Sequence, residues 1–210
     1  MKTRDKIVHT SLKLFNESGE RNITTNHIAS DLSISPGNLY YHFKNKQEII
    51  RDIFDSYSEE LLNLFSVIEE PKESLALFKR YLDAIFMLMW KYRFFYANLS
   101  QILQQDPLLH QRYLAVQEKL KGNLQFSFNK FIKLELIEIE EDDLQTVITS
   151  LHLIILSWLS YQAAVSLKTK ITEQVIYQGM LQMTAVLKPF TTQLGRQQLL
   201  ALEEEIAKKC

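Results

Sequence analysis

Between Thr24 and Ile50 the chain reads TTNHIASDLSISPGNLYYHFKNKQEII and places small, aromatic and basic polar residues close together. Pro36, Gly37 and Asn38 begin a short helical pattern, in which proline suits the first turn. A slim, hydrogen-bonding helix end of this kind fits the major groove of duplex DNA, where an amide such as Asn26 or Asn38 can bond to base edges. These residue types therefore favour recognition of double-stranded DNA.

Two further groups of side chains extend this interpretation. Tyr40, Tyr41 and His42 occupy adjacent positions, where a hydroxyl or a ring N–H can reach a phosphate. Thr25 begins the preceding helix and Lys46 the following one, so both are expected to hold the DNA backbone. Taken singly, Tyr40 and His42 could equally be structural residues, and it is the spacing of the whole set that favours DNA.

The segments around this stretch are expected to be helices. Val8, Leu12 and Phe15 recur at helical spacing before Gly19, which predicts a first helix over residues 4–18. Thr24 or Thr25 is expected to cap a second helix, Pro36 lies in the first turn of a third, and Asn45 is expected to cap a fourth. The second and third helices, joined by three residues, form a predicted helix-turn-helix.

The rest of the chain has sparse Gly and Pro and no strand-like alternation, which favours helices throughout. Asp106 and the pair at residues 142–143 are typical of helix starts. The predicted fold class is all-α. The further helices are expected over residues 72–92, 94–103, 108–136, 142–167, 172–187 and 196–208.

Composition limits the function classes. The 210 residues are 46% hydrophobic and include one cysteine, Cys210, so neither a disulfide framework nor a zinc-binding thiol pair is expected. We expect a cytoplasmic protein, because the start of the chain lacks a secretory pattern and the uncharged run at 144–167 is polar for a membrane span. Residues 1–51 are net basic although the whole chain is at −1, which suits a polyanion partner. No catalytic, cofactor-binding or metal-binding motif is found, so no enzyme activity, cofactor or metal is predicted.

Residues 4–55, with Phe15, Gly19, TTNHIA and SPGNLYYHFKNKQEII in register, resemble the N-terminal domain of TetR/AcrR-family transcriptional regulators. Ser33 departs from the family pattern, which commonly has glycine in the turn. The resemblance implies a homodimer that binds palindromic operator DNA and releases it when a small molecule enters the C-terminal domain. The positions at which it implies DNA contact are Thr25, Asn26, Gly37, Asn38, Tyr40, His42 and Lys46.

The resemblance also predicts the division of the chain. Residues 1–50 would form the DNA-binding domain, with the fourth helix continuing to about 66 as a connector, and residues 67–210 would bind a ligand and form the dimer. The helices at 144–167 and 172–187 are expected to pair with their symmetry mates. An aromatic-rich cavity would suit a hydrophobic effector such as an acyl chain or an aromatic compound. The candidate ligand residues are Trp90, Phe94, Asn98, Gln101, Tyr113, Phe131, His152, Trp158 and Gln162.

Two other functions remain open at this point. A protein of this fold could act chiefly through a protein partner, or it could carry a hydrophobic ligand without sequence-specific DNA binding. The presence of Gly37, Asn38, Tyr40 and Lys46 favours DNA over the first alternative. The carrier would need the cavity but not the helix-turn-helix. The sequence leaves open the operator, the regulated genes, the effector and whether transcription is repressed or activated.

Overall fold

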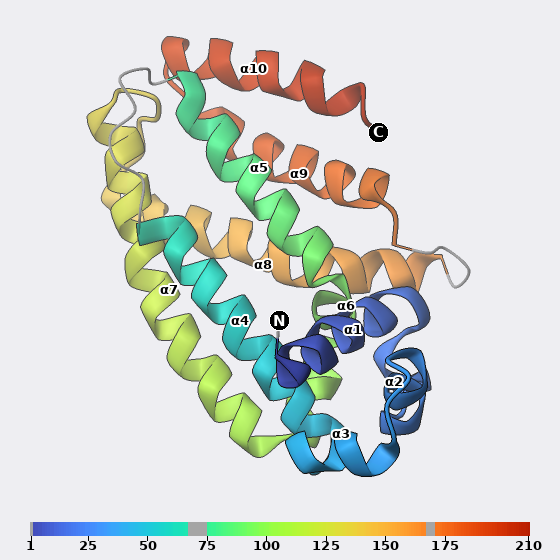
Figure 1. Cartoon of the computed structure of the whole chain (residues 1–210). Helices are drawn as coiled ribbons and strands as arrows, with labels where there is room; N and C mark the ends of the chain where they lie inside the picture. Colours follow the sequence, from blue (N-terminus) through green and yellow to red (C-terminus); the bar gives the residue numbers. More distant parts are fainter. Residues whose placement is uncertain (1, 67–74, 167–170) are drawn as a thin grey trace.

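The computed structural model describes residues 2–66, 75–166 and 171–210, and its regular structure is helical (Figure 1). Apart from a single antiparallel bridge between Ile137 and Thr191, these residues contain no strand, which confirms the predicted all-α class. The helices are α1 (Thr3–Ser18), η1 (Glu20–Asn22), α2 (Thr25–Asp31), α3 (Pro36–His42), α4 (Lys46–Ser66), α5 (Leu75–Lys91), α6 (Arg93–Gln105), α7 (Pro107–Lys133), α8 (Glu141–Val165), α9 (Glu173–Leu187), η2 (Lys188–Phe190) and α10 (Gln193–Ala207).

Side-chain caps set the starts of the short N-terminal helices. The Thr24 hydroxyl accepts from the His27 backbone N–H at 3.3 Å, and the Ser35 hydroxyl accepts from that of Asn38 at 3.1 Å. The Asn45 amide oxygen accepts from the Glu48 N–H at 2.9 Å. Each bond satisfies a donor that has no partner within its own helix. The predicted caps at Thr24 and Asn45 are confirmed.

The turn between α2 and α3 contains a residue in the left-handed region. Ser33 has a φ of 54°, a conformation that glycine adopts without the steric cost other residues meet. The Ile34 N–H donates to the Ala29 carbonyl at 3.0 Å and closes the turn. Beneath it, Ile28 and Leu39 are fully buried. The sequence departure at Ser33 is therefore accommodated with the backbone that glycine would favour.

The C-terminal helices form a bundle, and α4 packs against two of them, α5 and α7. In Figure 1, α4 runs beside α7, α8 lies along α9, and α10 covers α9 and α5. Asp106 caps α7 as predicted, because its carboxylate accepts from the Leu109 N–H at 3.1 Å. The helix expected at 108–136 ends at Lys133, since the chain turns at Glu135 with a φ of 53°. The expected helical residues 72–74 and 167 lie outside the described ranges.

The outer face of α8 is apolar and exposed. Leu153, Tyr161 and Val165 are between 57% and 66% exposed, although apolar side chains of this size usually lie against other protein. By length and composition, Glu141–Val165 is the one helix in the described ranges that could cross a membrane, and core helices of water-soluble proteins meet the same criteria. The residues that the structure describes in one chain therefore leave this face uncovered.

Candidate DNA interface and apolar cavity

The surface of α3 presents the polar groups that the sequence singled out. Gly37 and Asn38 are exposed on the first turn of α3, and Asn26 is exposed on α2. Tyr41 is 85% exposed, which is unusual for a large aromatic side chain. Such a surface offers an amide and phenol groups to a partner, with no covering apolar side chain from the described core.

Side-chain contacts fix the orientation of the two helices. The Thr25 hydroxyl on α2 and the Tyr40 hydroxyl on α3 lie 3.1 Å apart and share a hydrogen bond. The rings of Tyr41 and His42 meet edge to face, with centroids 5.1 Å apart. These contacts bring Thr25 together with Tyr40, and Tyr41 together with His42.

Lys46 has partners within the protein. Its ammonium donates to the carbonyl oxygens of Glu20 and Ile23 at 2.9 and 3.1 Å and lies 2.6 Å from the Glu20 carboxylate. It therefore fastens η1 to the start of α4. A phosphate contact by Lys46 stays a prediction, and it would require the ammonium to exchange at least one of these partners.

Two polar links join the helix-turn-helix unit to the C-terminal bundle. The Asn16 amide on α1 donates to the Lys91 carbonyl at 2.8 Å and accepts from the Phe94 N–H at 3.1 Å, so it holds the junction of α5 and α6. The Arg51 guanidinium on α4 forms a two-point ion pair with Asp106, at 2.7 and 3.0 Å. Burial tends to raise the pKa of Asp106, but Arg51 and backbone N–H groups outweigh it and lower that pKa. The carboxylate is therefore charged where it caps α7.

Inside the bundle lies an apolar cavity of about 100 Å³. Its wall comes from α4 to α10, and α4 contributes Tyr57, Leu61 and Leu64. Among the residues that the structure describes, the lining includes no Lys, Arg, Asp or Glu. The polar side chains among them are Tyr57, Tyr81, Tyr96, Ser127, His152 and Thr184.

Most of these polar groups already have protein partners. The Tyr57 and Tyr96 hydroxyls lie 3.1 Å apart and share a hydrogen bond, and Tyr81 donates to Ser127 at 2.9 Å. Burial raises the pKa of both Tyr57 and Tyr96, so both phenols stay neutral at pH 7. By contrast, His152 Nε2 is buried and has no hydrogen-bond partner among the described residues, and burial lowers the pKa of this imidazole. His152 is thus a neutral, unsatisfied polar group in an apolar wall.

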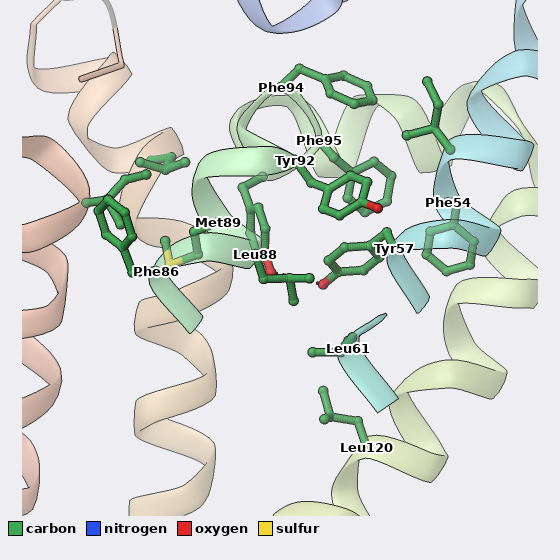
Figure 2. Close-up of a cluster of buried hydrophobic side chains, with 14 of the residues drawn as sticks. Phe54, Tyr57, Leu61, Phe86, Leu88, Met89, Tyr92, Phe94, Phe95 and Leu120 are labelled. Carbon is green, nitrogen blue, oxygen red and sulfur yellow. Dashed lines mark hydrogen bonds between the residues drawn. The ribbon is translucent and has the colours of Figure 1, made fainter. Parts of the chain in front are cut away.

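The Tyr57 ring also belongs to an aromatic cluster that joins α4 to the start of α6. Figure 2 shows Tyr57 facing Tyr92 and Phe95, with Phe54 on the same helix and Leu61 and Leu120 below. The centroid of Tyr57 lies 5.3 Å from that of Tyr92 and 5.5 Å from that of Phe95. Tyr57 both lines the cavity and packs in this cluster. A displacement of its ring at the cavity wall would therefore move α4 and alter the contacts of α4 with α6.

Two of the nine predicted ligand residues, Phe131 and His152, line the cavity. Phe94 is not among the lining residues, because its ring packs on Phe15 with centroids 5.3 Å apart. The Asn98 amide donates to the Phe94 carbonyl at 2.9 Å, at a residue whose backbone departs from helical angles. The other predicted residues outside the lining are Trp90, Gln101, Tyr113, Trp158 and Gln162.

Trp158 packs between α8 and α9. Its ring lies so close to Gly179 that an added Cβ there would come within 2.6 Å of it, and its Nε1 donates to the Val175 carbonyl at 2.5 Å. Trp158 therefore joins α8 to α9. On the outer side, it lines a shallow groove with Tyr161 and Val186.

Several wall residues lie outside the ligand set that the sequence predicts. Tyr57 and Leu61 were placed on the apolar stripe of the fourth helix, and Tyr81, Leu82, Ile85 and Leu88 repeat at helical spacing on α5. Two apolar stripes on helices that face one another are a signal for a shared cavity wall. The same stripes also build ordinary cores, so the pattern alone could not separate the two.

An exposed recognition helix, supported by a capped helix-turn-helix and joined to a helical bundle, defines a DNA-binding transcriptional regulator. Residues 7–53 match the model for bacterial regulatory proteins of the tetR family, and residues 56–199 match the model for the bacterial transcriptional repressor TetR. The chain belongs to the TetR family, which is not a family of enzymes.

Individual relatives agree with this assignment. A TetR-family regulator from Marinobacter aquaeolei VT8 is 38% identical, with a TM-score of 0.84 over 98% of this chain and 99% of that one. The ketosteroid regulator KstR2 of Mycobacterium tuberculosis shares the fold, with a TM-score of 0.63 at 17% identity over 91% of this chain and 96% of that one. The class C tetracycline repressor of Escherichia coli is 31% identical over 33% of this chain, which corresponds to 30% of that protein. This chain thus matches about a third of the length of that curated relative.

Proposed function

We propose that this chain is a homodimeric repressor that binds palindromic operator DNA and leaves it when a small hydrophobic molecule occupies the cavity. The observation that carries the DNA part of this proposal is the exposed polar surface of α3. A groove-facing helix needs polar side chains free of apolar cover at its N-terminal end, and Gly37, Asn38 and Tyr41 meet that requirement.

The proposed contacts divide by chemistry. Asn26 and Asn38 would meet base edges, and Gly37 would allow close approach of the backbone. The residues proposed to contact phosphates are Thr25, Tyr40, Tyr41, His42 and Lys46. Phosphate contacts position the protein, so their loss should weaken binding to all sequences alike, whereas loss of an asparagine should also relax specificity.

The dimer is proposed to form through α8 and α9. The exposed apolar side chains of α8 and the groove that Ile154, Trp158 and Val186 line support this choice. A second copy related by a two-fold axis would cover both features. The two recognition helices of such a dimer would contact half-sites about 34 Å apart, or a multiple of that distance.

The position of α4 supports ligand control. It supplies Tyr57 and Leu61 to the cavity wall, and its Arg51 is tied to Asp106 at the start of α7. A ligand that binds one arrangement of α4 more tightly than another would shift the population toward that arrangement. If the favoured arrangement spaces the two recognition helices wrongly, operator affinity falls.

The test is selection of bound DNA from a random pool by the purified protein. We expect a palindromic consensus, and Asn38→Ala should bind it about tenfold more weakly, since one good base contact is worth about 1–3 kcal/mol. Asn129→Ala is the matched control, because Asn129 is an exposed asparagine on α7 and should have no effect. If no consensus emerges, the repressor proposal fails and a carrier of hydrophobic ligands becomes the better interpretation.

The dimer has its own test. Leu153→Glu places a charge on the exposed face of α8 and should convert the dimer to monomers in sedimentation experiments. Leu200→Glu, on an exposed position of α10, is the control and should leave the dimer intact. A wild-type monomer, or an intact Leu153→Glu dimer, would contradict the proposed interface.

A further inference from the structure

The cavity wall makes binding of an ionic group unfavourable. The lining residues that the structure describes carry no charged side chain, so a bound carboxylate or ammonium would be buried without a counter-ion. Burying an unpaired charge is far less favourable than burying a neutral group that makes a hydrogen bond. The wall therefore selects against ligands whose buried end is charged.

Three of the five hydroxyl groups that line the wall, those of Ser127, Thr184 and Tyr81, offer no compensation. Ser127 donates to the Asn123 carbonyl, and Thr184 donates to the Leu181 carbonyl, each at 2.9 Å. Tyr81 in turn donates to Ser127. These three hydroxyl protons are used within the protein, so they are not available to neutralise an anion.

The cavity has a long wall and a small volume. Its lining residues extend from Phe78 to Leu88 on α5 and from Leu120 to Phe131 on α7, which corresponds to roughly 15 Å at the rise of an α-helix. A volume of about 100 Å³ distributed along such a wall would be a slim channel. An unbranched chain fits this shape, whereas a compact ring system of equal carbon content would have to push the helices apart.

His152 supplies one polar position in the wall. Its Nε2 is buried and finds no hydrogen-bond partner in the part of the chain that the structure describes, an arrangement that is rare in proteins and calls for an explanation. Because burial lowers the pKa of His152, the ring is neutral at pH 7 and Nε2 is either a donor or an acceptor, depending on the tautomer. A hydroxyl group can satisfy Nε2 in both cases, since it donates as well as accepts.

We propose that the cavity binds an unbranched aliphatic molecule with an uncharged, hydroxyl-type polar group, such as a fatty alcohol, which hydrogen-bonds to His152. This inference rests on the proposed function, because it names the chemical class of the effector. It goes further in excluding free fatty acids, cationic amphiphiles and polycyclic compounds as the preferred ligands.

The first experiment compares ligands on the full-length wild-type protein. Isothermal calorimetry would measure 1-decanol, decanoate and decyltrimethylammonium, which share a chain and differ in charge, and 1-adamantanol, which has the carbon count of 1-decanol in a compact cage. We expect 1-decanol to bind at one molecule per chain and each of the others at least tenfold more weakly. Equal or tighter binding of any of the other three, or no binding of 1-decanol, would overturn the proposal.

The second experiment tests His152. His152→Leu should weaken the binding of 1-decanol about three- to tenfold, which is the effect of one net hydrogen bond. 1-Chlorodecane has the same chain but no hydroxyl group, so it should raise the melting temperature less than 1-decanol does. That rise should be the same in His152→Leu as in the wild type. It should not lower the melting temperature of the ligand-free protein, because the substitution removes an unsatisfied buried group. The control is His110→Leu, an exposed histidine on α7, which should change none of these values. Unchanged 1-decanol affinity in His152→Leu would refute the role of this residue.

The outcomes separate this inference from the proposed function. If 1-decanol binds but no operator is selected, the ligand class stands and the repressor fails. If an operator is selected and is released by decanoate but not by 1-decanol, the repressor stands and the ligand class fails. Release of the operator by 1-decanol in the wild type, and at higher concentrations in His152→Leu, would support both.

Discussion

The ion pair between Arg51 and Asp106 gives the sharpest prediction about stability. Asp106 is 4% exposed and accepts two bonds from Arg51, and it also caps α7 through the Leu109 N–H. Asp106→Ala removes the cap, which costs about 1 kcal/mol. It also leaves the Arg51 charge without a partner, which we put at about 2 kcal/mol because the Arg51 side chain is 25% exposed. We therefore expect a loss of about 3 kcal/mol in the free energy of unfolding.

Asp106→Asn separates the two contributions. The asparagine keeps an oxygen that can accept from the Leu109 N–H, but it lacks the charge that pairs with Arg51. Its expected loss is about 2 kcal/mol, so the order of stability is wild type, then Asp106→Asn, then Asp106→Ala. The matched control is Asp142→Ala, an exposed acidic residue in the first turn of α8, for which the helix dipole suggests about 0.5 kcal/mol.

The assay is urea unfolding followed by circular dichroism at one fixed protein concentration, because the stability of the proposed dimer would depend on concentration. Equal slopes of free energy against urea would show that the variants unfold from comparable states. The reasoning would be refuted if Asp106→Asn matched the wild type within about 0.5 kcal/mol, or if it were less stable than Asp106→Ala.

Three further predictions follow from local geometry. Ser33→Gly should stabilise the protein by up to about 1 kcal/mol, because the left-handed backbone at Ser33 costs a non-glycine residue more than glycine loses in chain entropy; a lower melting temperature would contradict this. Gly195→Ala should lower the free energy of unfolding in urea by more than about 2 kcal/mol, since a Cβ would lie 1.9 Å from the Leu136 carbonyl oxygen. Gly122→Ala is the control: among the described residues no atom lies within 4 Å of the added Cβ, so this substitution should be neutral or stabilising. Because the pKa of Asp106 is lowered in the folded protein, its contribution is complete above about pH 4 and is lost as the pH falls further; Asp106→Asn should lack this acid-dependent component, and identical pH profiles would be evidence against it.

The sequence predicted the N-terminal unit well because its signals are local. A cap such as Thr24 or Asn45 acts on a backbone group three residues away, so the pattern of residue types contains the whole interaction. Ser33 was recognised as the glycine-like position of the turn, and its φ confirms this. The short helices η1 and η2 were missed, since a single turn has no periodicity to detect.

The cavity was harder to predict, because its wall joins side chains from helices far apart in the chain. Phe94 and Trp158 resemble ligand-binding aromatics in the sequence, yet one packs on α1 and the other on α9. Which stripe of a helix faces a hollow and which faces another helix depends on how the bundle is assembled. The sequence also does not reveal the partners of the Lys46 ammonium, which are the carbonyl and the carboxylate of Glu20 and the carbonyl of Ile23.

The Asn16 link also bears on protein engineering. Regulators of this kind invite the construction of chimaeras in which one DNA-binding unit replaces another while the sensing bundle is kept. In this chain, one amide side chain of α1 bonds to backbone atoms on both sides of the α5–α6 junction. A transplanted unit without asparagine at position 16 would leave a donor and an acceptor at that junction unmatched, even if every residue that faces DNA were correct. The helix-turn-helix unit and the C-terminal bundle are therefore not independent of one another. A functional exchange has to preserve the contact of Asn16 with the α5–α6 junction as well as the recognition helix.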